Sequence, residues 1–429
     1  MQFLLLVAFC AISALTLGLA IVNRRYQERH AHVVPPELQA LSVAQGQALF
    51  DADALRKAAS YARDRSRFGV LRSIASRCML LAFFFGGGLG VYDRWVSGLG
   101  LSFIAQGVVF ALGIMALSAV WELPFSVYRT FALEQKHGFN RMTPGLFISD
   151  ALKGLVLGGL MIAGLSAAAL WLVRLLPNGY WLAIWGLLLA FNVFVTLLAP
   201  YVIEPLFFKM TELAIPELGE RIQRLADRAG VRVSRVLKMD ASRRSSHSNA
   251  YFTGFGPVKR VVLFDTLIER MMPDEILAVL AHELGHWKKR HITQRFLLGE
   301  LASFVGLWIV SLLVAWPALP EWVFLNEASL PARAVIVALA WSVFSFPLTP
   351  LASAWSRRHE READRFARDL TQTPRALATA LAKLARDNLA SLTYHPWFEA
   401  VYASHPSVVE RVRTLTSASL HAAGETSAA

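Results

Sequence analysis

The sequence contains few cysteines and few charged residues for its length. Of 429 residues only two are cysteine, Cys10 and Cys78, and both lie in apolar stretches away from any histidine cluster. A disulfide framework and a cysteine-ligated metal site are therefore excluded, and we expect both thiols to pack as small hydrophobic side chains. Charged residues make up 17% of the chain. Soluble proteins carry about 25%, so an ordinary soluble protein is not expected.

Hydrophobic residues make up 55% of the chain and gather in long blocks. A helix that crosses about 30 Å of hydrocarbon needs about 20 apolar residues. Seven runs approach that length, which predicts seven membrane-spanning helices, although four glycines between 86 and 90 interrupt the second run. The predicted spans lie near residues 2–22, 78–97, 101–122, 154–177, 180–203, 297–317 and 333–352. Arg24 and Arg25 follow the first run, which favours a retained anchor over a cleaved signal peptide.

The net charge of +12 would suit a nucleic-acid-binding surface, but basic residues beside membrane spans explain it better. Segment 23–77 carries ten Lys and Arg residues and loop 123–153 carries four, whereas the alternate loops carry one each. The positive-inside rule then predicts that the N-terminus lies outside and the C-terminal hydrophilic stretches lie in the cytoplasm. We expect a bilayer as a partner and no nucleic acid. The sequence makes no prediction of oligomeric state.

The predicted spans leave two long hydrophilic stretches in the second half of the chain. The first contains a predicted hairpin, with strands near 249–252 and 260–264 joined by a turn at 253–257, and then a helix over 273–290. The second is predicted to be helical over 353–388 and 407–416. The predicted divisions are 1–203 (first five spans), 204–296 (first hydrophilic stretch), 297–352 (last two spans), 353–416 (second hydrophilic stretch) and 417–429 (disordered tail).

Residues 282–286 read His-Glu-Leu-Gly-His, an HExxH motif inside the helix predicted over 273–290. Positions i and i+4 share one helical face, so His282 and His286 can converge on one metal ion. Glu283 then lies beside the metal, where it can take a proton from bound water. A polar helix face with satisfied histidines is the alternative. The apolar positions of the helix leave the motif face free for a site, which favours the metal.

A catalytic zinc ion needs a third protein ligand, and acidic residues after the last predicted span offer one. Glu360 and Asp364 share a face of a predicted helix, whereas Glu362 points away from it. We take Glu360 as the ligand and Asp364 as the acceptor of a hydrogen bond from a ligand histidine. His359 is a second ligand candidate on spacing alone. Without the HExxH motif, a solvated charge run would be the better interpretation.

Six stretches in this order resemble the CAAX prenyl protease 1 family, the type I integral-membrane zinc metalloproteases. They are residues 133–140, 247–252, 259–267, 282–288, 356–367 and 404–406. The resemblance implies a mainly α, polytopic membrane fold. In it a seven-helix transmembrane barrel encloses a chamber, beside a cytoplasmic gluzincin-like protease domain with a small β-hairpin or sheet. It also implies one Zn²⁺ per chain bound by His282, His286 and Glu360, with Glu283 as general base.

The resemblance assigns roles to four further residues. Asn249 and Ala250 resemble the family's edge strand, whose backbone pairs with an extended substrate. His405 resembles the histidine that donates to the developing oxyanion. Arg411 matches an arginine near the active site, which orients substrate or pairs with an acidic residue.

The implied activity is hydrolysis of peptide bonds, with C-terminal CAAX processing of prenylated peptides as the implied reaction. A membrane-protein quality-control protease without prenyl specificity is the alternative if the source cell lacks prenylation. The implied membrane is the plasma membrane in a bacterium and the endoplasmic reticulum in a eukaryote. An intramembrane site-2-type protease is rejected because the polar run 287–290 follows the motif. A non-catalytic scaffold would need a broken site, whereas every expected catalytic residue is present.

Overall fold

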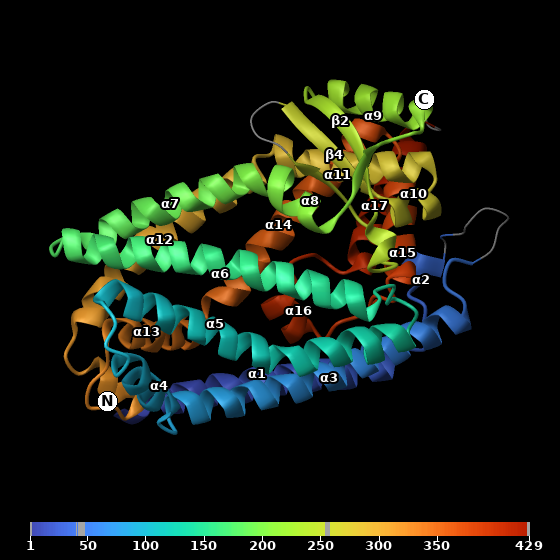
Figure 1. Ribbon diagram of the computed structural model, residues 1–429. Coiled ribbons are helices and arrows are strands. Elements are labelled where there is room, and N and C mark those ends of the chain that lie inside the picture. Colours follow the sequence, from blue (N-terminus) through green and yellow to red (C-terminus); the bar gives the residue numbers. More distant parts are fainter. Residues whose placement is uncertain (1, 40, 42–47, 254–257, 427–429) are drawn as a thin grey trace.

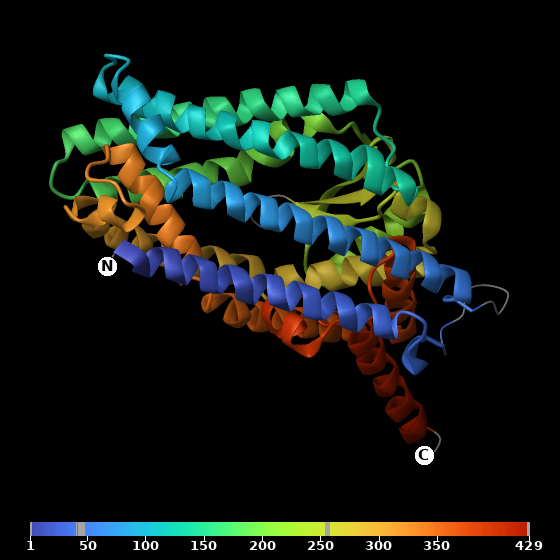
Figure 2. The same ribbon diagram turned by 90° about the horizontal axis from the view of Figure 1, so that it is seen from below.

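The computed structural model describes residues 2–39, 41, 48–253 and 258–426. Long helices run side by side through most of the molecule, and a small sheet covered by shorter helices lies at one end (Figure 1). Helices α1 (Gln2–His30) and α3 (Ala52–Phe84) pack along each other (Figure 2). Arg77 of α3 donates to Thr16 Oγ1 of α1 at 2.6 Å. The helical bundle is therefore joined by polar as well as apolar contacts.

Five helical stretches of the described residues are long and apolar enough to cross a membrane, and two bent pairs raise the number to as many as seven. This upper number agrees with the seven spans predicted from the sequence. The five stretches are α1, α5 (Phe103–Tyr128) with the π-helical turn η2 (Arg129–Glu134), α6 (Pro144–Leu175), α7 (Tyr180–Leu198) with η3 (Ala199–Ile203) and α8 (Glu204–Phe207), and α12 (His291–Ala315).

The two bent pairs break at residues that cannot continue a helix. Helices α3 and α4 (Gly88–Ser97) meet at 55°, and Gly87 between them has a φ of 85°, which glycine adopts without steric cost. Helices α13 (Leu330–Phe344) and α14 (Leu348–Thr371) meet at 64°, with Pro347 immediately before α14. The predicted span 78–97 therefore falls across the first break, and α3 begins much earlier than that span.

A four-stranded sheet lies beyond the long helices, with strand order β1-β2-β4-β3. Strands β3 and β4 pair antiparallel, as the predicted hairpin requires, although most of the predicted turn lies outside the described residues. Strand β3 forms one edge of the sheet. The sequence did not predict β1, which has only three residues. The strands are β1 (Met210–Glu212), β2 (Arg232–Met239), β3 (Ala250–Thr253) and β4 (Val258–Phe264).

Shorter helices cover this sheet and form a second hydrophobic core. Ile276, Leu280 and Leu284 of α11 (Pro273–Lys288) are fully buried in that core, beside Val261 and Leu263 of β4. The opposite face of α11 thus stays free for polar side chains. The remaining elements are α2 (Pro36–Gln39), α9 (Pro216–Arg228), η4 (Ala241–Arg243), α10 (Asp265–Arg270), η5 (Leu319–Val323), α15 (Pro374–Asp387), α16 (Pro396–Tyr402) and α17 (Val408–Thr426).

Two expectations from the sequence were wrong. Residues 417–426 are not a disordered tail, because α17 continues to Thr426 through a segment that contains alanine, the strongest helix former. Residues 427–429 lie outside the described part of the chain. Cys10 and Cys78 are free thiols, as expected, but both are exposed rather than packed in a core. They lie on α1 and α3, whose outer faces are apolar helix surfaces.

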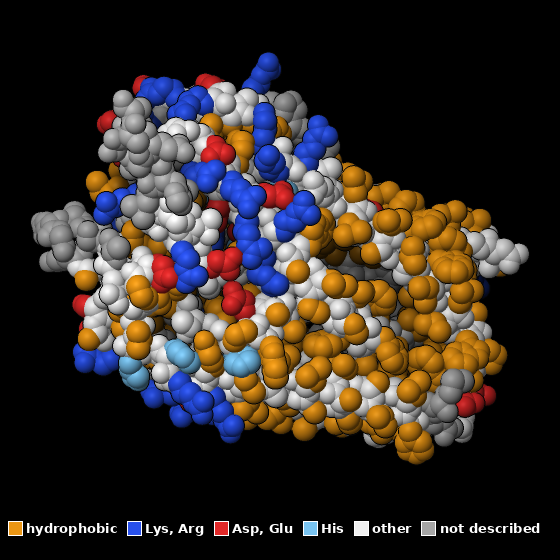
Figure 3. All heavy atoms as spheres, turned by 180° about the vertical axis from the view of Figure 1, so that it is seen from behind, with side chains coloured by type: hydrophobic (Ala, Val, Ile, Leu, Met, Phe, Trp, Pro, Cys, Tyr) orange, Lys and Arg blue, Asp and Glu red, His pale blue; other side chains and the backbone are white. Residues whose placement is uncertain are grey.

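The surface is divided between an apolar part and a charged part (Figure 3). Hydrophobic side chains cover the long helices, whereas Lys, Arg, Asp and Glu gather over the part that carries the sheet. Monomeric soluble proteins rarely expose apolar patches larger than a few hundred Å². The apolar part is therefore the surface that lipid covers, and the charged part projects into water.

Candidate metal centre and active site

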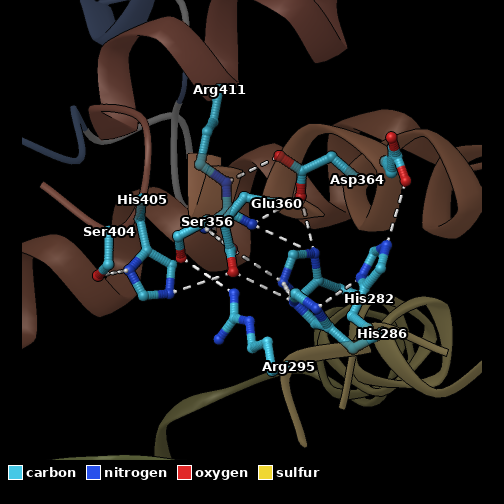
Figure 4. A network of polar contacts seen from close by, with 11 residues as sticks. His282, His286, Arg295, Ser356, Glu360, Asp364, Ser404, His405 and Arg411 are labelled. Atoms are coloured by element: carbon cyan, nitrogen blue, oxygen red, sulfur yellow. Dashed lines mark hydrogen bonds and ion pairs between the residues drawn. The ribbon is translucent and has the colours of Figure 1, made fainter. Parts of the chain in front are cut away.

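Helices α11 and α14 pack closely and bring three metal-ligand side chains together (Figure 4). One ligand atom from each of His282, His286 and Glu360 lies within 4.8 Å of the others. His282 Nε2 and His286 Nε2 are 3.2 Å apart. Glu360 Oε2 lies 3.3 Å from His282 Nε2, and its Oε1 lies 3.2 Å from His286 Nε2. The three side chains predicted from motif and spacing thus face one point.

The donor set fits a tetrahedral metal ion. Ligands that lie about 2.0–2.1 Å from a tetrahedral zinc ion are roughly 3.3 Å apart, which matches the separations above. Glu360 Oε2 is buried without a hydrogen-bond partner among the described residues, and an unsatisfied buried carboxylate oxygen is costly. The Nε2 atoms of His282 and His286 lie beside that oxygen. A cation bound between these three atoms would give each of them a partner.

Asp364 and Arg411 surround the second nitrogen of His282. Asp364 Oδ1 lies 2.8 Å from His282 Nδ1, which is the contact predicted from the sequence. Arg411 donates to both Asp364 oxygens, at 2.8 and 2.6 Å, and its guanidinium is buried. Burial lowers the pKa of His282, but the neighbouring carboxylates of Asp364 and Glu360 outweigh burial and raise the pKa to about 9. The surroundings of His282 therefore favour positive charge at this position.

His286 has a different partner, which the sequence did not predict. Its Nδ1 lies 3.1 Å from Nδ1 of His291, and Nε2 of His291 lies 3.1 Å from Glu362 Oε2. His359, the second ligand candidate, stacks on His291 with ring centroids 3.9 Å apart and does not join the three-ligand group. Only the fold could reveal His291, because the chain turns between α11 and α12 before that residue returns to the site.

Glu283 and His405 lie beside the three ligands. Glu283 follows His282 on α11 and is largely buried, which raises the pKa of its carboxyl above its ordinary value. His405 Nε2 lies 3.4 Å from Glu360 Oε1, while its Nδ1 lies 2.8 Å from Ser404 Oγ. The His405 side chain is 60% exposed, so this imidazole faces open space next to the ligands.

The edge strand predicted from the resemblance is present. Ala250 begins β3, and the carbonyl of Asn249 accepts a hydrogen bond from the Phe264 amide at 3.1 Å. Strand β3 contacts α11 and pairs with β4 on one side only, within the described residues. Its other side pairs with no strand among the described residues.

A His-His-Glu site on a charged domain, attached to a bundle of apolar helices, defines an integral-membrane metallopeptidase. Residues 23–209 match the family described as CAAX prenyl protease N-terminal, five membrane helices, and residues 212–419 match Peptidase family M48. The chain belongs to the CAAX prenyl protease 1 family of M48 membrane metalloproteases.

Relatives and a solved structure agree with this assignment. The CAAX prenyl protease 1 homolog of Homo sapiens is 31% identical over 94% of this chain and 92% of its own length. The homolog of Oryza sativa subsp. japonica is 38% identical over 73% of this chain and 74% of its own length. The crystal structure of S. mikatae Ste24p superposes with a TM-score of 0.89 at 27% identity, over 96% of this chain and 98% of that chain. The fold and the metalloprotease activity predicted from the sequence are thereby confirmed.

Proposed function

We propose that His282, His286 and Glu360 bind one zinc ion per chain and that the site cleaves prenylated CAAX peptides. The three ligand-atom separations of 3.2–3.3 Å support the metal site. Zinc is the usual ion for two histidines and one carboxylate with an open position. When bound, zinc polarises the scissile carbonyl and lowers the pKa of a bound water.

Glu283 and His405 perform the proton transfer and the charge stabilisation in this proposal. The Glu283 carboxylate takes a proton from the attacking water and passes it to the leaving amine nitrogen. A raised carboxyl pKa suits this double role, because the acid form must also be accessible. The exposed His405 Nε2–H donates a hydrogen bond to the carbonyl oxygen as negative charge develops on it.

Substrate binding is assigned to the free side of β3, near Asn249 and Ala250. An extended peptide adds there as a further strand, and its backbone hydrogen bonds hold the scissile amide beside the ligands.

Of the two roles predicted for Arg411, substrate orientation and pairing with an acidic residue, its contacts support the second. Because its guanidinium is buried against Asp364, it positions His282 through that carboxylate.

The names of the relatives, which are CAAX prenyl proteases, support this substrate class. The test compares cleavage of a farnesylated CAAX peptide, the same peptide without the farnesyl group, and a control with the acceptor Cys replaced by Ser. We expect kcat/KM to be at least tenfold higher for the farnesylated peptide. Equal rates on the first two peptides would contradict CAAX specificity and favour the quality-control alternative.

We also propose that the N-terminus lies outside and the active site lies on the cytoplasmic side, from the loop charges. Arg224 on α9 is exposed on the charged part and offers a labelling position. In a chain without Cys10 and Cys78, a cysteine introduced at Arg224 should react with an impermeant maleimide only from the cytoplasmic side. Reaction from the opposite side would reverse the proposed orientation.

A further inference from the structure

We infer that Glu362 and His291 form a hydrogen-bonded relay that positions His286 for the metal. The inference rests on the proposed zinc site and assigns a role to two residues that the catalytic steps above do not use. Both are positioning residues, because neither touches the substrate in this scheme. The ligand His286 is the residue through which they act.

The relay is continuous and largely buried. His291 is 1% exposed, and its two ring nitrogens face His286 Nδ1 and Glu362 Oε2 at 3.1 Å each. The other oxygen of Glu362 accepts from Arg358 Nε at 2.9 Å. Both nitrogens of His291 thus have one partner each, and no water is needed to complete the chain.

The hydrogen bonds can run in only one direction when His286 binds a cation. Nε2 of His286 must then be a lone pair, so Nδ1 carries the proton and donates to His291. Nδ1 of His291 must accept, which leaves its proton on Nε2. That proton is donated to the Glu362 carboxylate. Glu362 therefore fixes the tautomer of His291, and His291 fixes the tautomer of His286.

The fold holds the His291 ring in the plane that this relay requires. Arg290 adopts a φ of 58°, a left-handed conformation that turns the chain between α11 and α12 and returns His291 to the site. The ring of His359 stacks on His291 at an interplanar angle of 6°, and Trp355 packs on His359. Residues 355, 359 and 362 follow each other at i, i+4 and i+7, so one stripe of α14 positions His291.

Helix α14 therefore provides the carboxylates that position both ligand histidines. Asp364 contacts Nδ1 of His282 directly, and Glu362 reaches Nδ1 of His286 through His291. The ligand Glu360 precedes both carboxylates on α14. The three carboxylates of this helix segment are thus directed toward the proposed metal site. A simpler role for Glu362 is a surface ion pair with Arg358, which would contribute little.

Zinc affinity distinguishes a role of Glu362 in positioning His286 from a role in a surface ion pair. It is measured by competition with a chromogenic chelator on purified full-length protein. Loss of such an outer partner typically weakens metal affinity by about 10–100-fold. We expect that loss for Glu362→Ala and for His291→Phe, which keeps the stacked ring but removes both hydrogen bonds. Glu362→Gln retains an acceptor oxygen and should lose less than Glu362→Ala. Glu410→Gln is the matched control, because Glu410 also pairs with an arginine of α14, Arg361, but has no histidine partner among the described residues.

The second readout is the visible spectrum of the Co²⁺-substituted protein, which reports ligand geometry independently of activity. The spectrum should change in Glu362→Ala and His291→Phe and stay unchanged in Glu410→Gln. Zinc affinity within twofold of wild type, together with an unchanged Co²⁺ spectrum, would overturn the relay. Failure of the wild-type protein to bind zinc would instead overturn the proposed metal site.

Discussion

Gly285 of α11 lies directly against Ala363 of α14, with no room for a side chain between the two helices. A Cβ placed on Gly285 would lie 3.0 Å from Ala363 Cα and 3.1 Å from its carbonyl oxygen. Both are backbone atoms, which a side-chain rotation cannot move. Because His282 and His286 lie on α11 and Glu360 lies on α14, this close approach sets the separation of the three ligands.

Gly285→Ala should therefore damage the metal site although it adds only one methyl group. In an open helix position the same change normally stabilises by about 1 kcal/mol. Here the helices must separate, and we expect zinc affinity to fall at least about tenfold. Gly219→Ala is the control, because Gly219 lies in α9 and a Cβ added there would have no neighbour within 4 Å. Equal zinc affinity in both variants would contradict the role of the close approach.

Arg411→Met should destabilise the protein and weaken zinc binding, with KM affected less than kcat. Removing one partner of a buried ion pair typically costs about 3–5 kcal/mol, because the other charge stays buried. Arg411 and Asp364 are such a pair. Thermal unfolding, chelator competition and steady-state kinetics measure the three effects. Arg413→Met is the control, since Arg413 on the same helix is 64% exposed and pairs with Glu37 at the surface. A rise in KM alone would instead indicate direct substrate contact.

His405→Ala should lower kcat without loss of zinc. Removing one donor to a developing oxyanion costs about 10²–10³-fold in kcat. The side chain is 60% exposed, and its described contacts are with Ser404 and Glu360, so stability should change little. His32→Ala, at another exposed histidine, controls for the loss of an imidazole. A His405→Ala variant with wild-type kcat would remove this residue from the catalytic scheme.

The stability that His247 contributes should depend on pH. The carboxylate of Glu134, whose Oε2 lies 3.7 Å from Nε2 of His247, raises the pKa of His247 above 6.5, against the opposing effect of burial. Protonated His247 therefore stabilises the folded state fully below pH 6.5, and this contribution is lost as pH rises through the raised pKa. The difference in Tm between wild type and His247→Gln should be largest below pH 6.5 and shrink toward alkaline pH. A difference that grows with pH would contradict the pairing with Glu134.

Much of the architecture could be predicted from the sequence because apolar runs and helix periodicity are local signals. Seven runs predicted the spans, and the β-prone segments around 249–264 predicted the β3–β4 hairpin. The break at Gly87 was visible only as a weak run, because its angle depends on packing between α3 and α4. Strand β1 was missed because three residues carry too little pattern.

The site residues also divide into those that a local sequence pattern predicts and those that depend on packing between distant segments. His282, Glu283 and His286 form a motif within one helical turn, and Glu360 and Asp364 share one face of α14, so spacing alone was informative. His291 was missed because its contact with His286 depends on the left-handed turn at Arg290. The pairing partner of Arg411 was also left open. It is set by how α17 packs on α14, over a sequence separation that no local pattern encodes.

Zinc content and peptide cleavage, measured together on wild type and Glu283→Gln, test the central claim most directly. The three proposed ligands are intact in the variant, whereas its general base is replaced by a neutral amide. We predict one zinc ion per chain in both proteins, and cleavage by Glu283→Gln that is about 10²–10⁴-fold slower than by wild type. A wild-type protein that binds no zinc, or a variant that cleaves as fast as wild type, would contradict the proposed mechanism.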